Sequence, residues 1–269
     1  MPENLLEVEH LTKTYFPDRK EPLTALVDLT FSVADGEFLS LVGPSGCGKS
    51  TFINLACGIA QPTSGQIRLR GEPITGPISD VGIAFQAPIL LEWRTVFQNI
   101  LLPIEILERR VSPFHREHAG SLLKLVGLAG FTDAYPRELS GGMQQRVSIC
   151  RALVHNPSFL LMDEPFGALD AMTRDKMNLE LLRIWGQARK TLIFITHNIA
   201  EAVFLSDRVV VLTGRPGTVR DIVNIDSPRP RDPTGADFRT IEAHIRDLIG
   251  ESSADEDQWQ ARRSANAAR

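Results

Sequence analysis

Residues Gly43 to Thr51 read GPSGCGKST, and this stretch constrains the fold more than any other part of the chain. It fits the phosphate-loop pattern G-x-x-x-x-G-K-[ST]. The apolar run Phe38–Val42 precedes it and the helix-forming run Ser50–Leu55 follows it, which predicts a strand, a loop and a helix. Backbone N–H groups that turn inward around an anion need conformations that glycine adopts freely. The stretch therefore predicts a nucleotide site.

Different residues of this loop are expected to contact different parts of a bound triphosphate. We expect Lys49 to reach the β- and γ-phosphates and the Ser50 hydroxyl to ligate Mg²⁺. The helix that follows directs its positive end at the phosphates. The predicted nucleotide contacts are Gly43, Pro44, Ser45, Gly46, Cys47, Gly48, Lys49, Ser50 and Thr51.

Composition limits the other possibilities. The chain has 269 residues, of which 43% are hydrophobic and 23% charged, as in ordinary globular proteins. A net charge of −4 does not favour nucleic acid as a partner. No apolar run is long enough to span a membrane, and the acidic start MPENLLEVEH lacks a secretory stretch, so we expect a cytosolic chain. The three cysteines, without C-x-x-C spacing, favour neither zinc nor disulfides.

The hydrophobic pattern predicts an α/β fold. Strands are expected at Leu5–His10, Leu29–Val33, Phe38–Val42, Gln66–Leu69 and Val81–Phe85. Helical spacing from about Thr95 to Val126 predicts two or three inserted helices. Further elements are expected in the order strand Phe159–Met162, helix Ala171–Ala188, strand Leu192–Thr196, a helix from Ile199, strands Val209–Leu212 and Val219–Ile225, and a weak terminal helix with Ile241, Ile245 and Leu248.

A second motif completes the phosphate loop. The apolar strand that begins at Phe159 ends in Asp163 and Glu164. The strand edge is expected to place Asp163 beside the phosphate loop, where it holds Mg²⁺ through water. Glu164 can polarise a water for in-line attack on the γ-phosphate. On their own, two such carboxylates also fit a solvated turn.

A third motif, Leu139-Ser-Gly-Gly-Met-Gln-Gln-Arg146, precedes that strand. It predicts a helix with Ser140 at the N-cap, where two glycines leave the N–H groups of the first turn uncovered. Such a helix end binds anions. One triphosphate does not require two anion sites in one monomer, so this second site needs an explanation.

These motifs together resemble those of the ATP-binding subunits of ABC transporters, over about residues 5 to 225. Gly43–Thr51 resembles that family's Walker A, Leu139–Arg146 its signature, and Phe159–Glu164 its Walker B. The resemblance implies a P-loop NTPase core of the ABC type with a mixed sheet, an N-terminal antiparallel β part and an α-helical subdomain. It places the ATPase domain at 1–231, with the helical subdomain inserted at about 87–155, and leaves 232–269 as a C-terminal extension that ends in a polar tail.

The resemblance also implies roles for single residues outside the three motifs. Gln86 corresponds to the glutamine that senses Mg²⁺ and the attacking water, and His197 to the switch histidine that contacts the γ-phosphate. Ala168-Leu169-Asp170 resembles the D-loop. Tyr15 sits where the family stacks an aromatic ring on adenine, although Phe16 is an alternative. The implied sites are: catalytic, Glu164, His197, Gln86 and Lys49; nucleotide contacts beyond the loop, Tyr15, Ser140, Gly141, Gly142, Gln144 and Asp170; Mg²⁺ ligands, Ser50, Gln86 and Asp163.

The resemblance explains the second anion site, because two copies of such subunits pair head to tail around ATP. Ser140 and Gly142 of one copy then cover the γ-phosphate that Lys49 of the other holds. It further implies separate permease subunits in the membrane, a periplasmic or extracellular substrate-binding protein, and a peripheral location on the cytoplasmic side of the inner membrane.

Several segments resemble the nitrate, sulfonate and taurine import branch of the family. They are Pro73–Pro77, Trp93–Val96, Thr213–Gly217 and Ser227–Arg231. Glu92 stands where that branch usually has a proline before the Trp-Arg pair. A soluble ABC ATPase that acts in DNA repair or translation is the alternative, and such proteins generally carry two nucleotide units, a long coiled coil or basic surfaces.

Overall fold

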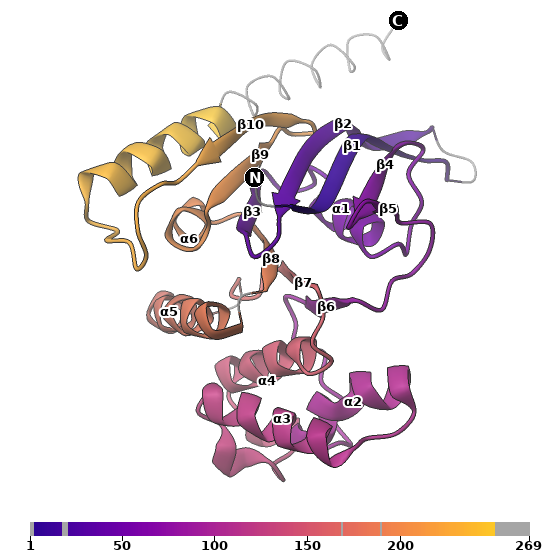
Figure 1. Cartoon of the computed structure of the whole chain (residues 1–269). Coiled ribbons are helices and arrows are strands. Elements are labelled where there is room, and N and C mark those ends of the chain that lie inside the picture. The colour runs from indigo at the N-terminus through magenta and orange to yellow at the C-terminus, as the bar shows by residue number, and fades with distance from the viewer. Residues whose placement is uncertain (1–2, 18–20, 168, 189, 251–269) are drawn as a thin grey trace, which may run out of the picture. The chain divides into compact units, whose positions relative to one another are not determined.

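The computed structural model describes residues 3–17, 21–167, 169–188 and 190–250. The chain forms two compact units, of which unit 1 takes residues 1–78 and 195–269 and unit 2 takes residues 79–194 (Figure 1). The chain passes from unit 2 back to unit 1 within the buried strand β8 (Thr191–Thr196). The domain boundaries expected from the sequence stay predictions.

An antiparallel sheet in unit 1 has the order β2-β1-β4-β5. Its strands are β1 (Asn4–Tyr15), β2 (Leu23–Ala34), β4 (Ser64–Leu69) and β5 (Glu72–Pro73). β1 and β2 extend well beyond the predicted strands because their ladder continues past irregularities at His10 and Asp28, where φ is 48° and 52°. These irregularities interrupt the alternation of apolar residues on which the prediction depended. The predicted N-terminal antiparallel part is confirmed.

Three further strands of unit 1 have the order β10-β9-β3. They are β3 (Phe38–Val42), β9 (Arg208–Leu212) and β10 (Val219–Asn224). β9 runs parallel to β3 and antiparallel to β10, so the predicted mixed sheet is confirmed. The helix α1 (Lys49–Ala56) follows β3 in the chain, and α6 (Ile199–Leu205) packs against β3.

Unit 2 holds most of the helices. Its strands β6 (Val81–Ala84) and β7 (Phe159–Asp163) pair in parallel. The helices are α2 (Val96–Glu108), α3 (Pro113–Leu125), α4 (Gly141–Leu153) and α5 (Ala171–Ala188), with 3₁₀ turns at Ala129–Phe131 and Pro136–Glu138. α4 packs against α2, α3 and β6. The predicted α-helical part is confirmed.

Local sequence explains where these helices begin. Thr95 and Gln98 form a capping box at the start of α2, and Ser112 and His115 form one at the start of α3. Each box satisfies two backbone N–H groups that the first turn leaves without partners. α2 continues through Pro103 to Glu108, so the proline does not end the helix.

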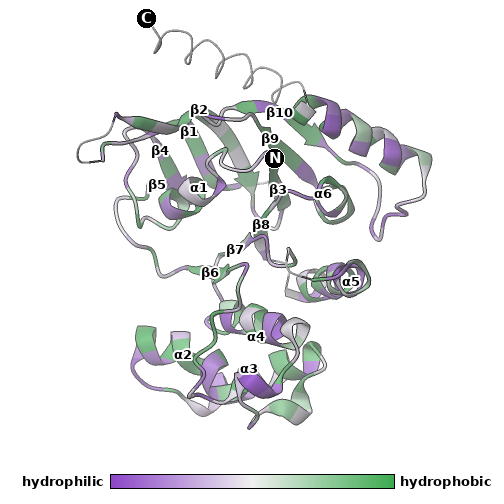
Figure 2. Cartoon of the chain, turned by 180° about the vertical axis from the view of Figure 1, so that it is seen from behind, coloured by the Kyte–Doolittle hydropathy of each residue, from purple (hydrophilic) through white to green (hydrophobic). Residues whose placement is uncertain are grey.

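The C-terminal part of unit 1 is a helix over residues 236–250, as far as the structure describes it. Hydrophobic and hydrophilic residues alternate along it (Figure 2). Phe238 and Ile245 are buried in a cluster with Val42, Val209 and Val211, and Ile241 and Leu248 pack against that cluster. Burial of this apolar face holds the helix on the core of unit 1.

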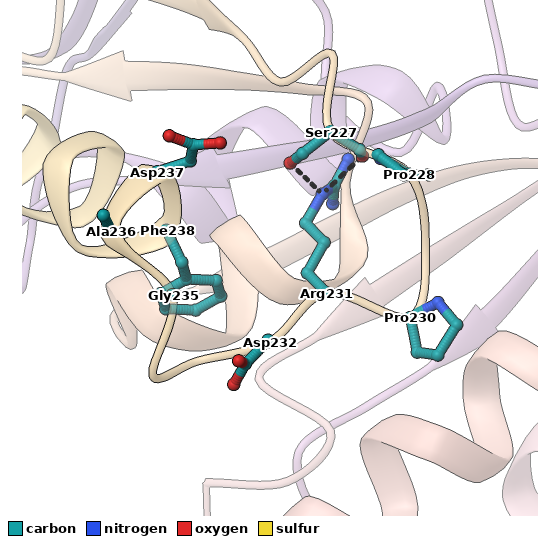
Figure 3. A pocket seen from close by; sticks show the side chains of 9 residues that line it. All are labelled: Ser227, Pro228, Pro230, Arg231, Asp232, Gly235, Ala236, Asp237 and Phe238. Carbon is teal, nitrogen blue, oxygen red and sulfur yellow. Dashed lines mark hydrogen bonds between the residues drawn. The ribbon is translucent and has the colours of Figure 1, made fainter.

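Hydrogen bonds from Arg231 hold the segment before this helix, residues 225–235, in place. Its Nε donates to the Ser227 carbonyl at 3.0 Å (Figure 3). Its Nη1 donates to the carbonyl of Val203, in α6, at 2.8 Å. Burial, together with the smaller effect of the nearby Arg229 charge, lowers the pKa of Arg231 to about 10. The arginine thus lines the pocket between residues 227 and 238 and links this segment to α6.

Candidate nucleotide site

The phosphate loop of unit 1 joins a buried strand to a helix that no side chain caps. All residues of β3 are buried, and Gly48 is the N-cap of α1 with φ at 96°. A Cβ on Gly48 would lie 2.4 Å from Cδ2 of Leu26. The loop can therefore take this shape only with glycine at position 48, and the N–H groups at the start of α1 receive no side-chain cap.

Lys49 lies inside the loop. Its side chain is buried, and its Nζ donates to the carbonyls of Gly43 at 2.8 Å and Pro44 at 3.1 Å. Ser50 is exposed and Thr51 is half-buried. The amine is thus placed within the turn that the motif predicts for phosphates.

Tyr15, at the end of β1, lies next to the helix that follows the loop. Its hydroxyl donates to Oγ1 of Thr51 at 3.4 Å. Nζ of Lys13 lies 5.1 Å from the centre of the Tyr15 ring, a cation–π contact. The structure thus brings Tyr15 and Thr51 together, whereas Phe16 is 72% exposed.

His197 is exposed directly after β8. Hydrogen bonds of the residues directly before and after His197 hold this turn in place. Oγ1 of Thr196 donates to Oε2 of Glu201 at 2.8 Å and accepts from the Asn198 N–H at 3.0 Å, while Asn198 caps α6. A histidine on such a turn has a defined position although its ring is open to solvent.

The two carboxylates of unit 2 stand at the end of β7. Asp163 is the last residue of β7, and Glu164 follows with φ at 43°. This left-handed conformation is uncommon for a residue with a side chain, and strain of this kind is concentrated at functional sites. Both residues are half-buried.

Gln86 lies close to this turn. It follows β6, which pairs in parallel with β7, so both chains leave the sheet at the same edge. A Cβ on Gly167 would lie 3.2 Å from Nε2 of Gln86 and 3.8 Å from Cβ of Glu164. The structure therefore brings Gln86 and Glu164 together beside Gly167.

The signature forms the predicted helix start. Ser140 is the N-cap of α4, and its Oγ accepts from the Met143 N–H at 3.4 Å. A Cβ on Gly141 would meet nothing within 4 Å, so this side of the helix end is open. Nε2 of Gln144 donates to the carbonyl of Pro136 at 2.9 Å, which ties the helix start to the preceding turn.

Thr173 lies close both to Asp170 and to Gly142 of the signature. Oδ1 of Asp170 accepts from the Thr173 N–H at 3.1 Å, and a Cβ on Gly142 would lie 3.5 Å from Cγ2 of Thr173. Hydrogen bonds from the side chain and backbone of Thr173 lower the pKa of Asp170. Ala168 of the same predicted motif lies outside the described residues.

Two residues of α4 hold the segment around Gln86, a role that motif reasoning missed. Nε2 of Gln145 donates to the carbonyl of Phe85 at 3.2 Å. Arg151 donates to the carbonyls of Pro88 at 2.9 Å and Ile89 at 2.7 Å, and burial lowers the pKa of Arg151. Gln145 belongs to the signature motif, so the sequence offered a reason to consider it as a site residue. No sequence motif includes Arg151.

The predicted Mg²⁺ ligands fit the ion by their chemistry. Ser50, Gln86 and Asp163 offer a hydroxyl, an amide and a carboxylate, and Mg²⁺ prefers such oxygen donors. Ser50 belongs to unit 1, and Gln86 and Asp163 belong to unit 2. Each stands at the end of a regular element or just beyond it.

Comparison with known proteins gives one consistent result. The family model described as ABC transporter matches residues 26–167. An uncharacterised ABC transporter ATP-binding protein of Methanocaldococcus jannaschii is 46% identical over 245 residues, which are 91% of each chain. A nitrate import ATP-binding protein of Synechococcus elongatus is 44% identical (84% of this chain, 85% of the relative). An aliphatic sulfonates import ATP-binding protein of Bacillus cereus is 39% identical (86% and 90%).

A solved structure supports the fold assignment. The dimeric, post-hydrolysis state of the ATP-binding cassette MJ0796 bound to ADP and Pi is similar with a TM-score of 0.71 and 31% sequence identity. The likeness covers 83% of this chain and all of that one. The predicted P-loop fold of the ABC type is confirmed.

Proposed function

Because the chain belongs to the ABC transporter family and is an ATPase of that family, we propose that it energises an importer for a small nutrient such as nitrate, a sulfonate or taurine. The observation that carries this proposal is the presence, in one chain, of a phosphate loop and an open, Ser140-capped helix end. The relatives named for nitrate and sulfonate import support the cargo class.

The loop residues Gly43 to Thr51 would hold the phosphates of ATP. Lys49 leaves the carbonyls of Gly43 and Pro44 for the β- and γ-phosphates and offsets their charge. Tyr15 stacks on adenine. Ser50, Gln86 and Asp163 would hold Mg²⁺, which supplies charge compensation at the phosphate oxygens when bound.

Glu164 acts as the general base. Its carboxylate takes a proton from water as the water oxygen bonds to the γ-phosphorus, and the bond to the bridging oxygen breaks so that ADP leaves. Gln86 and His197 orient the water and the γ-phosphate. The strained backbone of Glu164 and its place beside Gln86 support this assignment.

A second copy of the chain completes the site. Ser140, Gly141, Gly142 and Gln144 of one copy cover the γ-phosphate held by the other, and Asp170 lies at the same junction. The open first turn of α4 is suited to an anion that this copy does not itself bind. The dimeric state of the similar cassette supports this arrangement.

We assign the permease contact to the segment that follows Gln86. Trp93 is 74% exposed and Ile89 59%. The buried Asn99 fixes this segment, because its Nδ2 donates to the carbonyls of Leu91 at 3.1 Å and Arg94 at 3.0 Å. An exposed apolar pair on a rigid segment fits a protein partner. No helix among the described residues is long and apolar enough to span the bilayer.

In this proposal, the permease subunits are separate chains, and the subunit sits on the cytoplasmic face of the inner membrane. A periplasmic or extracellular binding protein delivers the cargo to the permease, so this chain meets it only indirectly.

The dimer is tested with Glu164→Gln, which should retain ATP without hydrolysing it. Light scattering after gel filtration with ATP should show a dimer for this variant and a monomer without nucleotide. Asp175→Asn, which removes a carboxylate from the exposed surface of α5, is the matched control and should keep hydrolysis. A Glu164→Gln variant that stays monomeric with ATP contradicts the proposed site.

The transport role is tested by purification of the tagged chain from detergent-solubilised membranes. Membrane permease subunits should co-purify, and Trp93→Ala should lose them while it keeps ATP binding. Recovery of ribosomes or DNA in place of permeases would instead favour a soluble role. Uptake of labelled nitrate and of an alkanesulfonate by cells with and without the subunit then separates the cargoes.

A further inference from the structure

The turn between β9 and β10, residues 213–218, lies against the phosphate loop. Gly217 is anchored to β2 in both directions, because its N–H donates to the Ala25 carbonyl and its carbonyl accepts from the Val27 N–H, each at 2.9 Å. A Cβ on Gly217 would lie 2.0 Å from the carbonyl oxygen of Cys47. The turn and the phosphate loop are therefore in close backbone contact.

Internal hydrogen bonds make this turn stiff. Thr213 N–H donates to the Thr218 carbonyl, and Thr218 N–H donates to Oγ1 of Thr213, each at 2.9 Å. Oγ1 of Thr213 also donates to the Pro216 carbonyl at 3.3 Å. The backbone of Arg215 is thus held from both sides.

The Arg215 side chain covers the middle of the phosphate loop. Its Nε donates to the carbonyl of Gly46 at 3.1 Å. A Cβ on Gly46 would lie 2.1 Å from Nη2 and 2.6 Å from Cζ of Arg215, so the guanidinium lies directly on this glycine. Gly46 has φ at 82°, a conformation that a residue with a side chain rarely adopts.

This contact fixes one peptide group of the loop at both ends. Arg215 holds the Gly46 carbonyl, and the N–H of the same peptide, on Cys47, donates to the Pro44 carbonyl at 3.3 Å. That Pro44 carbonyl also accepts from Nζ of Lys49 at 3.1 Å. A short chain of hydrogen bonds therefore links Arg215 to the lysine expected to hold the phosphates.

We propose that Arg215 is a positioning residue that pre-organises the phosphate loop for nucleotide. A loop already held in its binding shape loses less conformational entropy when the ligand arrives. The arginine acts through the Gly46 carbonyl and needs no contact with the nucleotide. This inference rests on the proposed function of the loop.

The first test compares nucleotide affinities. Titration calorimetry with ADP, and with ATP and Mg²⁺, should give Arg215→Ala a dissociation constant higher by about fivefold, the size of one typical net protein hydrogen bond. At saturating ATP, kcat should stay within about twofold of wild type, because the chemical groups are untouched. Arg220→Ala, which removes an exposed arginine from β10, is the matched control and should bind as wild type.

Arg215→Lys separates position from charge. Lysine keeps the positive charge but lacks the planar Nε donor, so it should not restore affinity. Full restoration by lysine would mean that Arg215 attracts the nucleotide by charge alone, and it would overturn the positioning role.

A second readout does not depend on activity. Cys47 and Cys57 are both buried cysteines of unit 1, and Cys47 lies within the phosphate loop. In Arg215→Ala, a thiol reagent should label Cys47 faster than in wild type, while Cys57 keeps its slow rate. Faster labelling of both would indicate a general loss of structure, which would overturn the inference.

The outcomes for the two proposals differ. If the wild-type chain binds no nucleotide, the proposed function is wrong and the role of Arg215 fails with it. If wild type binds nucleotide while Arg215→Ala binds equally well and leaves Cys47 protected, only the role of Arg215 is wrong.

Discussion

Gln145 donates a hydrogen bond from its Nε2 to the carbonyl of Phe85 at 3.2 Å. The glutamine is buried within α4, four residues after the helix begins, and Phe85 directly precedes Gln86. The helix that presents Ser140 is therefore attached to the segment that presents Gln86. The two bonds from Arg151 to Pro88 and Ile89 attach α4 to the same segment on the other side of Gln86.

We predict that Gln145→Leu lowers kcat for ATP hydrolysis about fivefold and the free energy of unfolding by ~1 kcal/mol. Leucine keeps the volume but leaves the Phe85 carbonyl without this donor, so Gln86 loses a support. ATP affinity should change little, because the phosphate loop is not involved. Single-turnover hydrolysis and urea unfolding measure the two effects, with the exposed Gln187→Leu as control. An unchanged kcat would show that this bond does not position Gln86.

Substitutions at Tyr15 and Phe16 distinguish which of the two rings stacks on adenine. Tyr15→Ala should raise the KM for ATP about tenfold, the size of one lost aromatic stacking contact. Tyr15→Phe should stay near wild type, because the bond from the hydroxyl to Thr51 is long. Phe16→Ala should have no effect. A larger rise in KM for Phe16→Ala than for Tyr15→Ala would assign the stacking to Phe16.

Local signals in the sequence were sufficient for elements with a clear start. Ser140 was expected to cap a helix and does, since an N-cap depends on only a few consecutive residues. The lengths of β1 and β2 were underestimated, because the ladder between them continues beyond the irregularities at His10 and Asp28. Which residues pair across such an irregularity depends on the partner strand, which the local pattern does not contain.

The candidate site was predictable where a motif is continuous and not where distant segments meet. The phosphate loop is read directly from Gly43 to Thr51. The cover that Arg215 gives to Gly46 joins residues far apart in the chain. Likewise, the left-handed backbone of Glu164 has no sequence signature, because it arises from how the turn after β7 is held.

Because of His155, we predict that the free energy of unfolding decreases at acidic pH. Burial lowers the pKa of this histidine, against smaller opposing effects of the Val81 carbonyl and Asp80. Nε2 lies 3.2 Å from the Val81 carbonyl, and Nδ1 is buried without a partner, so a second proton has no acceptor. As the pH falls below about 6.5, the unfolded chain binds this proton before the folded chain does, and stability declines.

The measurement is the free energy of unfolding between pH 8 and pH 5. His155→Gln keeps a donor for the Val81 carbonyl but does not titrate, so its decline with falling pH should be shallower than that of wild type. An equal decline in both proteins would mean that other groups account for the acid sensitivity.

Gly82 and Gly120 of unit 2 form a matched pair for close packing. A Cβ on Gly82, in β6, would lie 2.1 Å from the carbonyl oxygen of Ala152 in α4, whereas one on Gly120, in α3, would meet nothing within 4 Å. Gly82→Ala should therefore destabilise the fold by about 1–3 kcal/mol, because β6 and α4 must separate. Gly120→Ala should stabilise it by about 0.5–1 kcal/mol, since alanine favours a helix interior. Urea unfolding of both variants checks the pair, and a tolerated alanine at position 82 would contradict the close contact between β6 and α4.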